Sequence, residues 1–181
     1  MGYSISWIAV RGRPKAEVLA SLGLRDTGES DEANESPASG TELPTGWYVV
    51  FLSDLTHPFV APATLQKLSE GCEVVGCQIE EHVMFSASFC YSNGRHDWRI
   101  IHESEKGLYN LELEGTVPSF VAEIHMAAQG EQDKEGKAAR ADHIFEVPLR
   151  ATERLCGYRH DRWKFDWGEP RFTKLAKNGR G

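Results

Sequence analysis

The chain has few cysteines and no long hydrophobic run, and each shortage excludes a class of protein. Its four cysteines contain no C-x-x-C pair, so the paired spacing of a zinc site is missing. The longest apolar run, residues 47–52, is far too short to cross a bilayer. The N-terminus has neither a basic leader nor a long apolar segment. We expect a cytoplasmic protein with reduced thiols and no membrane partner.

The common motifs of cofactor and nucleophile chemistry are also missing. The chain contains neither G-x-G-x-x-G nor a Walker sequence, and no G-x-S-x-G elbow surrounds a serine. We therefore expect no cofactor, and a non-enzymatic role is favoured over an enzymatic one.

Acidic residues outnumber basic ones, but unevenly along the chain. The 27 Asp and Glu against 20 Lys and Arg give a net charge of −7. From Tyr158 onward seven basic residues face three acidic ones, so this tail carries +4 and the remainder −11. An acidic body repels the phosphates of nucleic acids and suits a partner with a basic surface. A basic protein is therefore favoured as a partner over nucleic acid.

The first part of the chain predicts two strand-then-helix units. Alternation predicts a strand over residues 3–10, and the apolar run 47–52 predicts a strand covered on both faces. A proline at the start and a glycine at the end bracket predicted helices over residues 14–23 and 62–71. The inward-facing positions of these helices are Val18, Leu19, Leu22, Leu65 and Leu68.

Residues 25–46 differ from their surroundings in composition. Six acidic residues, two prolines and many Ser, Thr and Gly leave little to bury. Such a composition predicts an acidic mobile loop, because it cannot offset the entropy lost on ordering. A loop this long is either a tolerated surface insertion or a functional segment.

Residues 72–114 predict an antiparallel meander. From Val75 to Tyr91 most odd positions are apolar and most even ones polar, which predicts one long strand with a buried and a solvated face. Its length predicts a bend or bulge near residues 80–82. Asn93-Gly94 predicts a two-residue hairpin turn. The expected pairs across this hairpin are Ser92 with Arg95, Phe89 with Trp98, Ala87 with Ile100, and Phe85 with His102.

The remaining residues complete the predicted fold. Apolar spacing predicts a helix after Pro118 that ends in a polar run from Gly130, a strand over residues 144–147 and a helix over residues 148–157. We expect one α+β domain over residues 1–157, with an antiparallel-rich sheet of about five or six strands and helices on one face. Residues 158–181 are expected to form a basic, aromatic C-terminal arm, as an edge strand or a wrapping segment.

The solvated face of the meander supplies the first candidate site. Glu80 and His82 share it, and Glu103 is their expected neighbour across the hairpin. An imidazole among carboxylates is able to bind a divalent ion or move a proton. The alternative interpretation is a solvated face whose charged residues have no specific role. With Asp31 and Glu32 of the acidic loop, these three are the candidate partner-binding residues; no metal ligand is assigned.

Two further clusters carry alternatives. Ser53, Asp54 and His57 follow an apolar strand, but formation of a turn and a cap explains them better than a catalytic triad. Residues 159–163 join two arginines to His160, Asp161 and Trp163, which suits stacking on a single-stranded nucleic acid. Packing of the arm on the acidic body is the favoured reading of this second cluster.

Motifs in the first 115 residues resemble a group of uncharacterised bacterial proteins. The chain has Trp7-Ile-Ala-Val-Arg-Gly12, then Glu17-Val-Leu-Ala-Ser-Leu-Gly23, and later Leu65-Gln-Lys-Leu-Ser-Glu-Gly71. In that group a W-x-x-V-R-G strand leads into a V-L-x-x-L-G helix, and an L-S-x-G helix end follows. Some small proteins of this kind are similar to immunity proteins, so the resemblance implies a bacterial binding protein and assigns no catalytic residue.

The sequence thus favours a non-enzymatic protein-binding protein of inhibitor or immunity type, acting on a basic protein partner. The alternative is a small hydrolase or metal-dependent enzyme that uses His57 or His82. A nucleic-acid binder working through the arm is a third possibility.

Overall fold

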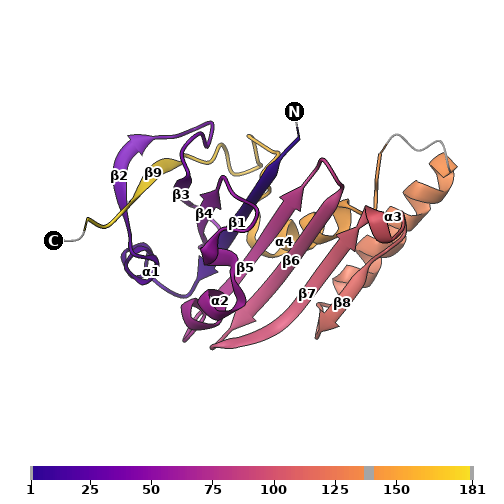
Figure 1. The fold of residues 1–181 in the computed structure, drawn as a ribbon, viewed down its shortest axis with the longest axis horizontal. Helices are drawn as coiled ribbons and strands as arrows, with labels where there is room; N and C mark the ends of the chain where they lie inside the picture. The colour runs from indigo at the N-terminus through magenta and orange to yellow at the C-terminus, as the bar shows by residue number, and fades with distance from the viewer. Residues whose placement is uncertain (1, 137–140, 180–181) are drawn as a thin grey trace.

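Strand β1 (Ser4–Arg11) lies at the centre of a nine-stranded sheet in which every neighbouring pair is antiparallel (Figure 1). The computed structural model describes residues 2–136 and 141–179. Successive side chains of β1 point to opposite faces, so Trp7 enters one hydrophobic core and Ile8 the other. A strand that is apolar on both faces is stable only with cover on each side, which explains its central position.

The α+β class and the antiparallel sheet are confirmed, whereas the prediction of five or six strands is wrong. The additional strands come from the predicted loop, from the arm, and from a long predicted strand that is two strands. From one edge to the other the order is β2 (Leu24–Ser30), β9 (Thr173–Lys177), β3 (Ala38–Glu42), β4 (Tyr48–Leu52), β1, β5 (Glu73–Glu80), β6 (Phe85–Ser92), β7 (Arg95–Glu103) and β8 (Glu112–Gly115).

Helices pack on both faces of the sheet, so the prediction of helices on one face is also wrong. Helices α1 (Lys15–Leu22) and α2 (Pro62–Leu68) cover one side with the buried residues predicted for them. Helices α3 (Phe120–Glu135) and α4 (Glu146–Cys156) lie behind β5–β8 in the view of Figure 1. Short 3-10 turns, η1 (Pro58–Val60) and η2 (Ser104–Lys106), complete the elements. No helix in the described part of the chain is long and apolar enough to span a bilayer.

The predicted mobile loop at residues 25–46 is wrong, because β2 and β3 occupy half of it. Both strands pair with β9, and β3 also pairs with β4. Small residues such as Ser39 and Gly40 are buried there. Main-chain hydrogen bonds to neighbouring strands order a segment whatever its side chains, and composition does not report them.

The predicted long strand over residues 75–91 is two strands. A turn over residues 81–84, with Met84 at φ 50°, reverses the chain and pairs Glu80 of β5 with Phe85 of β6. Paired residues share a face, so Phe85 lies on the side opposite to Ile79. Ser86 therefore points into the core under α4, where its hydroxyl donates to the Phe145 carbonyl at 2.8 Å. The even positions of this segment, which include Ser86 and Ser88, were expected to face water; for these two serines the prediction is wrong, because both are fully buried.

The Asn93-Gly94 turn is confirmed, with positive φ at both residues and Ser92 paired with Arg95. The predicted register also holds for the next pair, Tyr91 with His96, but from Cys90 onward it is wrong by one residue. A bulge between Cys90 and Tyr91 leaves Asp97 without a cross-strand partner, so Cys90 pairs with Trp98. The other pairs that replace the predicted ones are Phe89 with Arg99, Ala87 with Ile101, and Phe85 with Glu103.

The C-terminal arm belongs to the sheet. Strand β9 lies inside it, between β2 and β3, rather than at an edge. Tyr158 and Phe172 are buried in the core on the α4 side, which fits the predicted packing of the arm on the body. The predicted strand over residues 144–147 is wrong, since residues 144 and 145 form a turn and residues 146 and 147 begin α4. The predicted end of the preceding helix near Gly130 is also wrong, because α3 continues to Glu135; residues 137–140 of the predicted polar run lie outside the described residues.

Candidate functional site

One side of the sheet's β5–β8 half forms an open face. We give this name to Gln78 and Glu80 of β5, Phe85 of β6, Arg99, Ile101 and Glu103 of β7, and Glu112 and Glu114 of β8, which share one side by register. Figure 1 shows no helix over the β7 and β8 part of this side in the described chain, because α3 and α4 lie on the opposite side. The open face is therefore available to a partner.

A row of three residues crosses the open face. Glu80, Phe85 and Glu103 are direct cross-strand neighbours on β5, β6 and β7. Directly opposite side chains have Cβ atoms about 5 Å apart, so the two carboxylates flank the phenyl ring. The row lines a cavity of about 160 Å³ whose further walls are Leu55, Val83, Ser104 and Glu105. The walls of the cavity are thus partly apolar and partly acidic.

Local hydrogen bonds orient both carboxylates of the row. Glu80 Oε1 lies 2.6 Å from His82 Nδ1, and the Glu80 pKa is lowered by hydrogen bonds, first from Ser4 and then from His82. Glu103 Oε1 accepts from Lys106 Nζ at 2.8 Å. Lys106 Nζ also lies 2.9 Å from Glu112 Oε1. Glu80 therefore stays ionised near neutral pH, as a cation-binding group must.

The structure brings together two of the five predicted partner-binding residues, Glu80 and Glu103. His82 lies beside Glu80, in the turn that joins β5 to β6, with 64% of its side chain exposed. The register error hid Phe85, because a one-residue shift moves a side chain to the other face. A prediction of a hairpin turn near residue 82, instead of a bend, would have placed Phe85 on the same face as Glu80.

Asp31 and Glu32 lie elsewhere. Asp31 is buried at 6% exposure and its carboxylate accepts the backbone amides of Glu35 and Ser36, at 3.0 and 3.2 Å. It shapes the turn between β2 and β3 and lies away from the open face, so we do not include it in the proposed docking surface. Glu32 is exposed and lies at the rim of a second, larger cavity.

The side chains of the serine, aspartate and histidine that follow β4 are engaged in hydrogen bonds to backbone groups. His57 Nδ1 accepts the Phe59 amide at the start of η1, and Asp54 Oδ1 accepts the Thr56 amide at 2.9 Å. Ser53 Oγ donates to the Pro37 carbonyl. These contacts support the turn-and-cap interpretation. Within the described residues, no three His, Cys, Asp or Glu side chains gather as a metal site.

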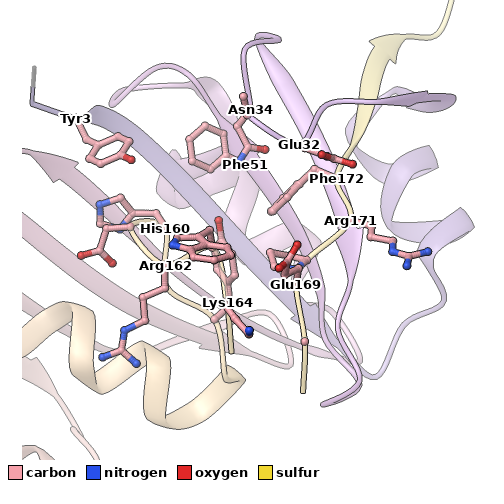
Figure 2. Close-up of a pocket in the computed structure, with 16 residues that line it drawn as sticks. Tyr3, Glu32, Asn34, Phe51, His160, Arg162, Lys164, Glu169, Arg171 and Phe172 are labelled. Carbon is pink, nitrogen blue, oxygen red and sulfur yellow. The ribbon is translucent and has the colours of Figure 1, made fainter. Parts of the chain in front are cut away.

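The second cavity lies beside the arm and has a volume of about 920 Å³. Figure 2 shows Tyr3 and His160 at one side of it, and Glu32 and Phe172 at the other. The arm is fixed here by Arg159, whose guanidinium donates to Asp161 at 2.5 and 2.8 Å and to Glu146 of α4 at 3.0 Å. The sequence identified this cluster but not the cavity, which needs walls from four distant segments.

A buried histidine distinguishes this second cavity. His160 is 8% exposed, and burial lowers its pKa to about 4, so the imidazole is neutral near pH 7. Neither ring nitrogen has a hydrogen-bond partner in the part of the chain that the structure describes. Its ring packs edge-on against Tyr3, with 4.9 Å between centroids.

Comparison of the chain with protein-family models, with curated proteins and with solved structures finds no match to any of them. The resemblance of its N-terminal motifs to bacterial immunity-like proteins stays a prediction.

Proposed function

We propose that the protein is a non-enzymatic binding protein of inhibitor or immunity type that docks its open face on a basic protein. The observation that carries the proposal is the row Glu80–Phe85–Glu103, an aromatic ring between two oriented carboxylates above an apolar cavity. An arginine or lysine side chain fits this arrangement, because its stem is apolar and its head is cationic.

Three interactions support recognition of such a side chain. Its stem would pack on Leu55 and Val83, the latter 47% exposed at present. Its cation would lie over the Phe85 ring, which is worth about 0.5–2 kcal/mol. The two glutamates would complete the contact. In the described part of the chain five glutamates and two cations lie around this face, and this acidic excess would speed association with a basic partner.

A peptide pair tests the recognition step directly. We expect acetyl-Gly-Arg-Gly-amide to shift the NMR resonances of Phe85, Ile101 and their neighbours, whereas the citrulline peptide, which has the same shape without the charge, leaves them unchanged. The Glu80→Gln/Glu103→Gln double variant should abolish the arginine-induced shifts. Equal shifts from both peptides, or shifts confined to another surface, would overturn the proposal.

Capture of a partner from the native cell tests the wider function. The double variant should retain a basic protein about tenfold less well than the unmodified chain, and retention should fall as salt is raised. Glu29→Gln/Glu70→Gln is the matched control, because it removes the same charge from two exposed glutamates outside the open face. Equal losses in the two double variants would show that net charge alone acts, contrary to the proposal.

A further inference from the structure

The cavity beside the arm is separate from the open face. Phe51, Tyr158 and Phe172 line it, and all three belong to the hydrophobic core on the α4 side of the sheet. The open face lies on the other side. Whatever binds in this cavity therefore does so independently of the proposed protein partner.

The unpartnered imidazole is the first indication of a ligand. A buried polar group without a hydrogen bond costs about 1–3 kcal/mol, so proteins rarely keep one without a use. His160 keeps two such atoms, and in the neutral ring one nitrogen donates and the other accepts. Both nitrogens are closed to solvent, so a ligand in the cavity must shift a neighbouring side chain to reach the ring, and a donor or an acceptor at its edge would then satisfy one of them.

The aromatic walls are the second indication. Tyr3, Phe51, Tyr158 and Phe172 surround the cavity, and Trp163 lies at it with 72% of its surface exposed. An exposed indole beside a cavity of this kind offers a flat surface on which another ring stacks. Binding would bury that exposed indole.

The charges around the cavity call for no net charge on the ligand. Arg162 lies 2.6 Å from Glu153, and Asp161 is held by Arg159. The remaining charged groups at the cavity are two glutamates, Lys164 and Arg171, and Figure 2 shows Arg171 pointing away from the cavity. With Arg171 turned away, the excess at the cavity is one negative charge, which is too little to select a charged ligand, and the interior is aromatic with one neutral hydrogen-bonding group.

We propose that this cavity binds an uncharged, planar heteroaromatic molecule of nucleoside size, stacked on Trp163 with a polar edge on His160. The volume lies at the upper end of the range typical of small-molecule sites, about 300–1,000 Å³. Stacking supplies affinity, and the imidazole selects rings that carry a nitrogen or an exocyclic polar group.

Titration with adenosine, guanosine and indole tests the site, with ribose as the control that lacks a ring. At least one ring compound should shift the ring ¹⁵N resonances of His160 and the indole N–H of Trp163 saturably, and ribose should not. Trp163→Ala should weaken binding about tenfold through loss of stacking. His160→Phe should weaken it about tenfold, because it removes the hydrogen bond and keeps the ring. The Glu80→Gln/Glu103→Gln variant should bind as the unmodified chain does.

Several outcomes would overturn the assignment. They are no saturable shift with any of the three ring compounds, equal shifts with ribose, and unchanged affinity in His160→Phe. Binding of a single-stranded oligonucleotide without binding of free nucleosides would also overturn it. His160→Phe should unfold at or above the temperature of the unmodified chain, since a buried unpartnered polar ring becomes apolar; a lower temperature would mean that the imidazole is already satisfied.

Discussion

His102 and Asp142 form a buried pair that connects three segments of the chain. His102 Nε2 lies 2.9 Å from Asp142 Oδ2, and its Nδ1 lies 2.6 Å from the Asn110 carbonyl. Asp142 Oδ1 also accepts the amides of Ile144 and Phe145 just before α4. The pair therefore fixes the loop after β7 and the start of α4 to the sheet, without a route for substrate, since His102 is fully buried.

Replacing Asp142 by Asn should destabilise the fold by about 3 kcal/mol at pH 7, because it leaves a buried partner uncompensated. Burial by itself would raise the Asp142 pKa, but hydrogen bonds from His102 and the two amides outweigh it and lower that pKa. The stabilisation is thus present above the unfolded pKa of about 3.9 and is lost as the pH falls below it. Urea unfolding at pH 7, 5 and 3 measures both effects.

Asp133→Asn is the matched control for Asp142→Asn. Asp133 is exposed, and among the described residues it accepts a hydrogen bond from the Tyr109 hydroxyl alone, at 2.7 Å, so its replacement should change stability by less than about 0.5 kcal/mol. If Asp142→Asn lost as much stability between pH 7 and pH 3 as the unmodified chain does, that result would contradict the proposed role of the pair.

Among the elements, β5 depends on a glycine where it crosses beneath an aromatic ring. Gly76 pairs with Ile8 of β1 and Phe89 of β6. A Cβ at Gly76 would lie 2.8 Å from the Phe89 ring and would also collide with the Trp7 carbonyl oxygen. The phenyl ring therefore covers the strand at the position where a side chain is missing, which lets three strands pack closely.

Gly76→Ala should destabilise the protein by about 2 kcal/mol, the typical cost of overpacking a filled core. Gly130→Ala should have the opposite effect and stabilise it by about 0.5–1 kcal/mol, since Gly130 lies within α3 and nothing lies within 4 Å of its added Cβ. Unfolding in denaturant measures both. A neutral Gly76→Ala would show that the Phe89 ring is free to move aside.

On the scale of the whole molecule, the two ends of the chain meet in one sheet. β2 lies at an edge and pairs with β9, which lies near the C-terminus. The arm also buries Tyr158 and Phe172 against the core. The fold therefore depends on the C-terminal residues, although their composition suggests an arm outside the domain.

Deleting residues 172–181 should lower the unfolding temperature strongly and open residues 24–42 to protease. The deletion removes the buried Phe172 and Leu175, each of which is worth about 2–5 kcal/mol, and exposes the edges of β2 and β3. Deletion of residues 179–181 alone should leave both measurements unchanged. An unaltered unfolding temperature in the longer deletion would contradict the central position of β9.

The sequence predicted the charged residues of the candidate sites better than the aromatic and buried ones. Glu80 and Glu103 were expected to share a face, and they do, although the expected register was shifted by one residue. Phe85 was missed because one turn and one bulge each move side chains between faces. His160 was recognised as part of a basic, aromatic cluster, but its burial depends on Tyr3 and on the cavity walls from other segments.

Local order determined what the sequence revealed by itself: the strand at β1, the helices bracketed by Pro and Gly, and the Asn93-Gly94 turn. These features depend on a few adjacent residues, whose periodicity and backbone preferences act at short range. The tertiary structure alone decided that an acidic, serine-rich segment becomes β2 and β3, that β9 enters between them, and that helices pack on both faces of the sheet. Those outcomes depend on hydrogen bonds between backbones far apart in the chain, which side-chain composition does not encode.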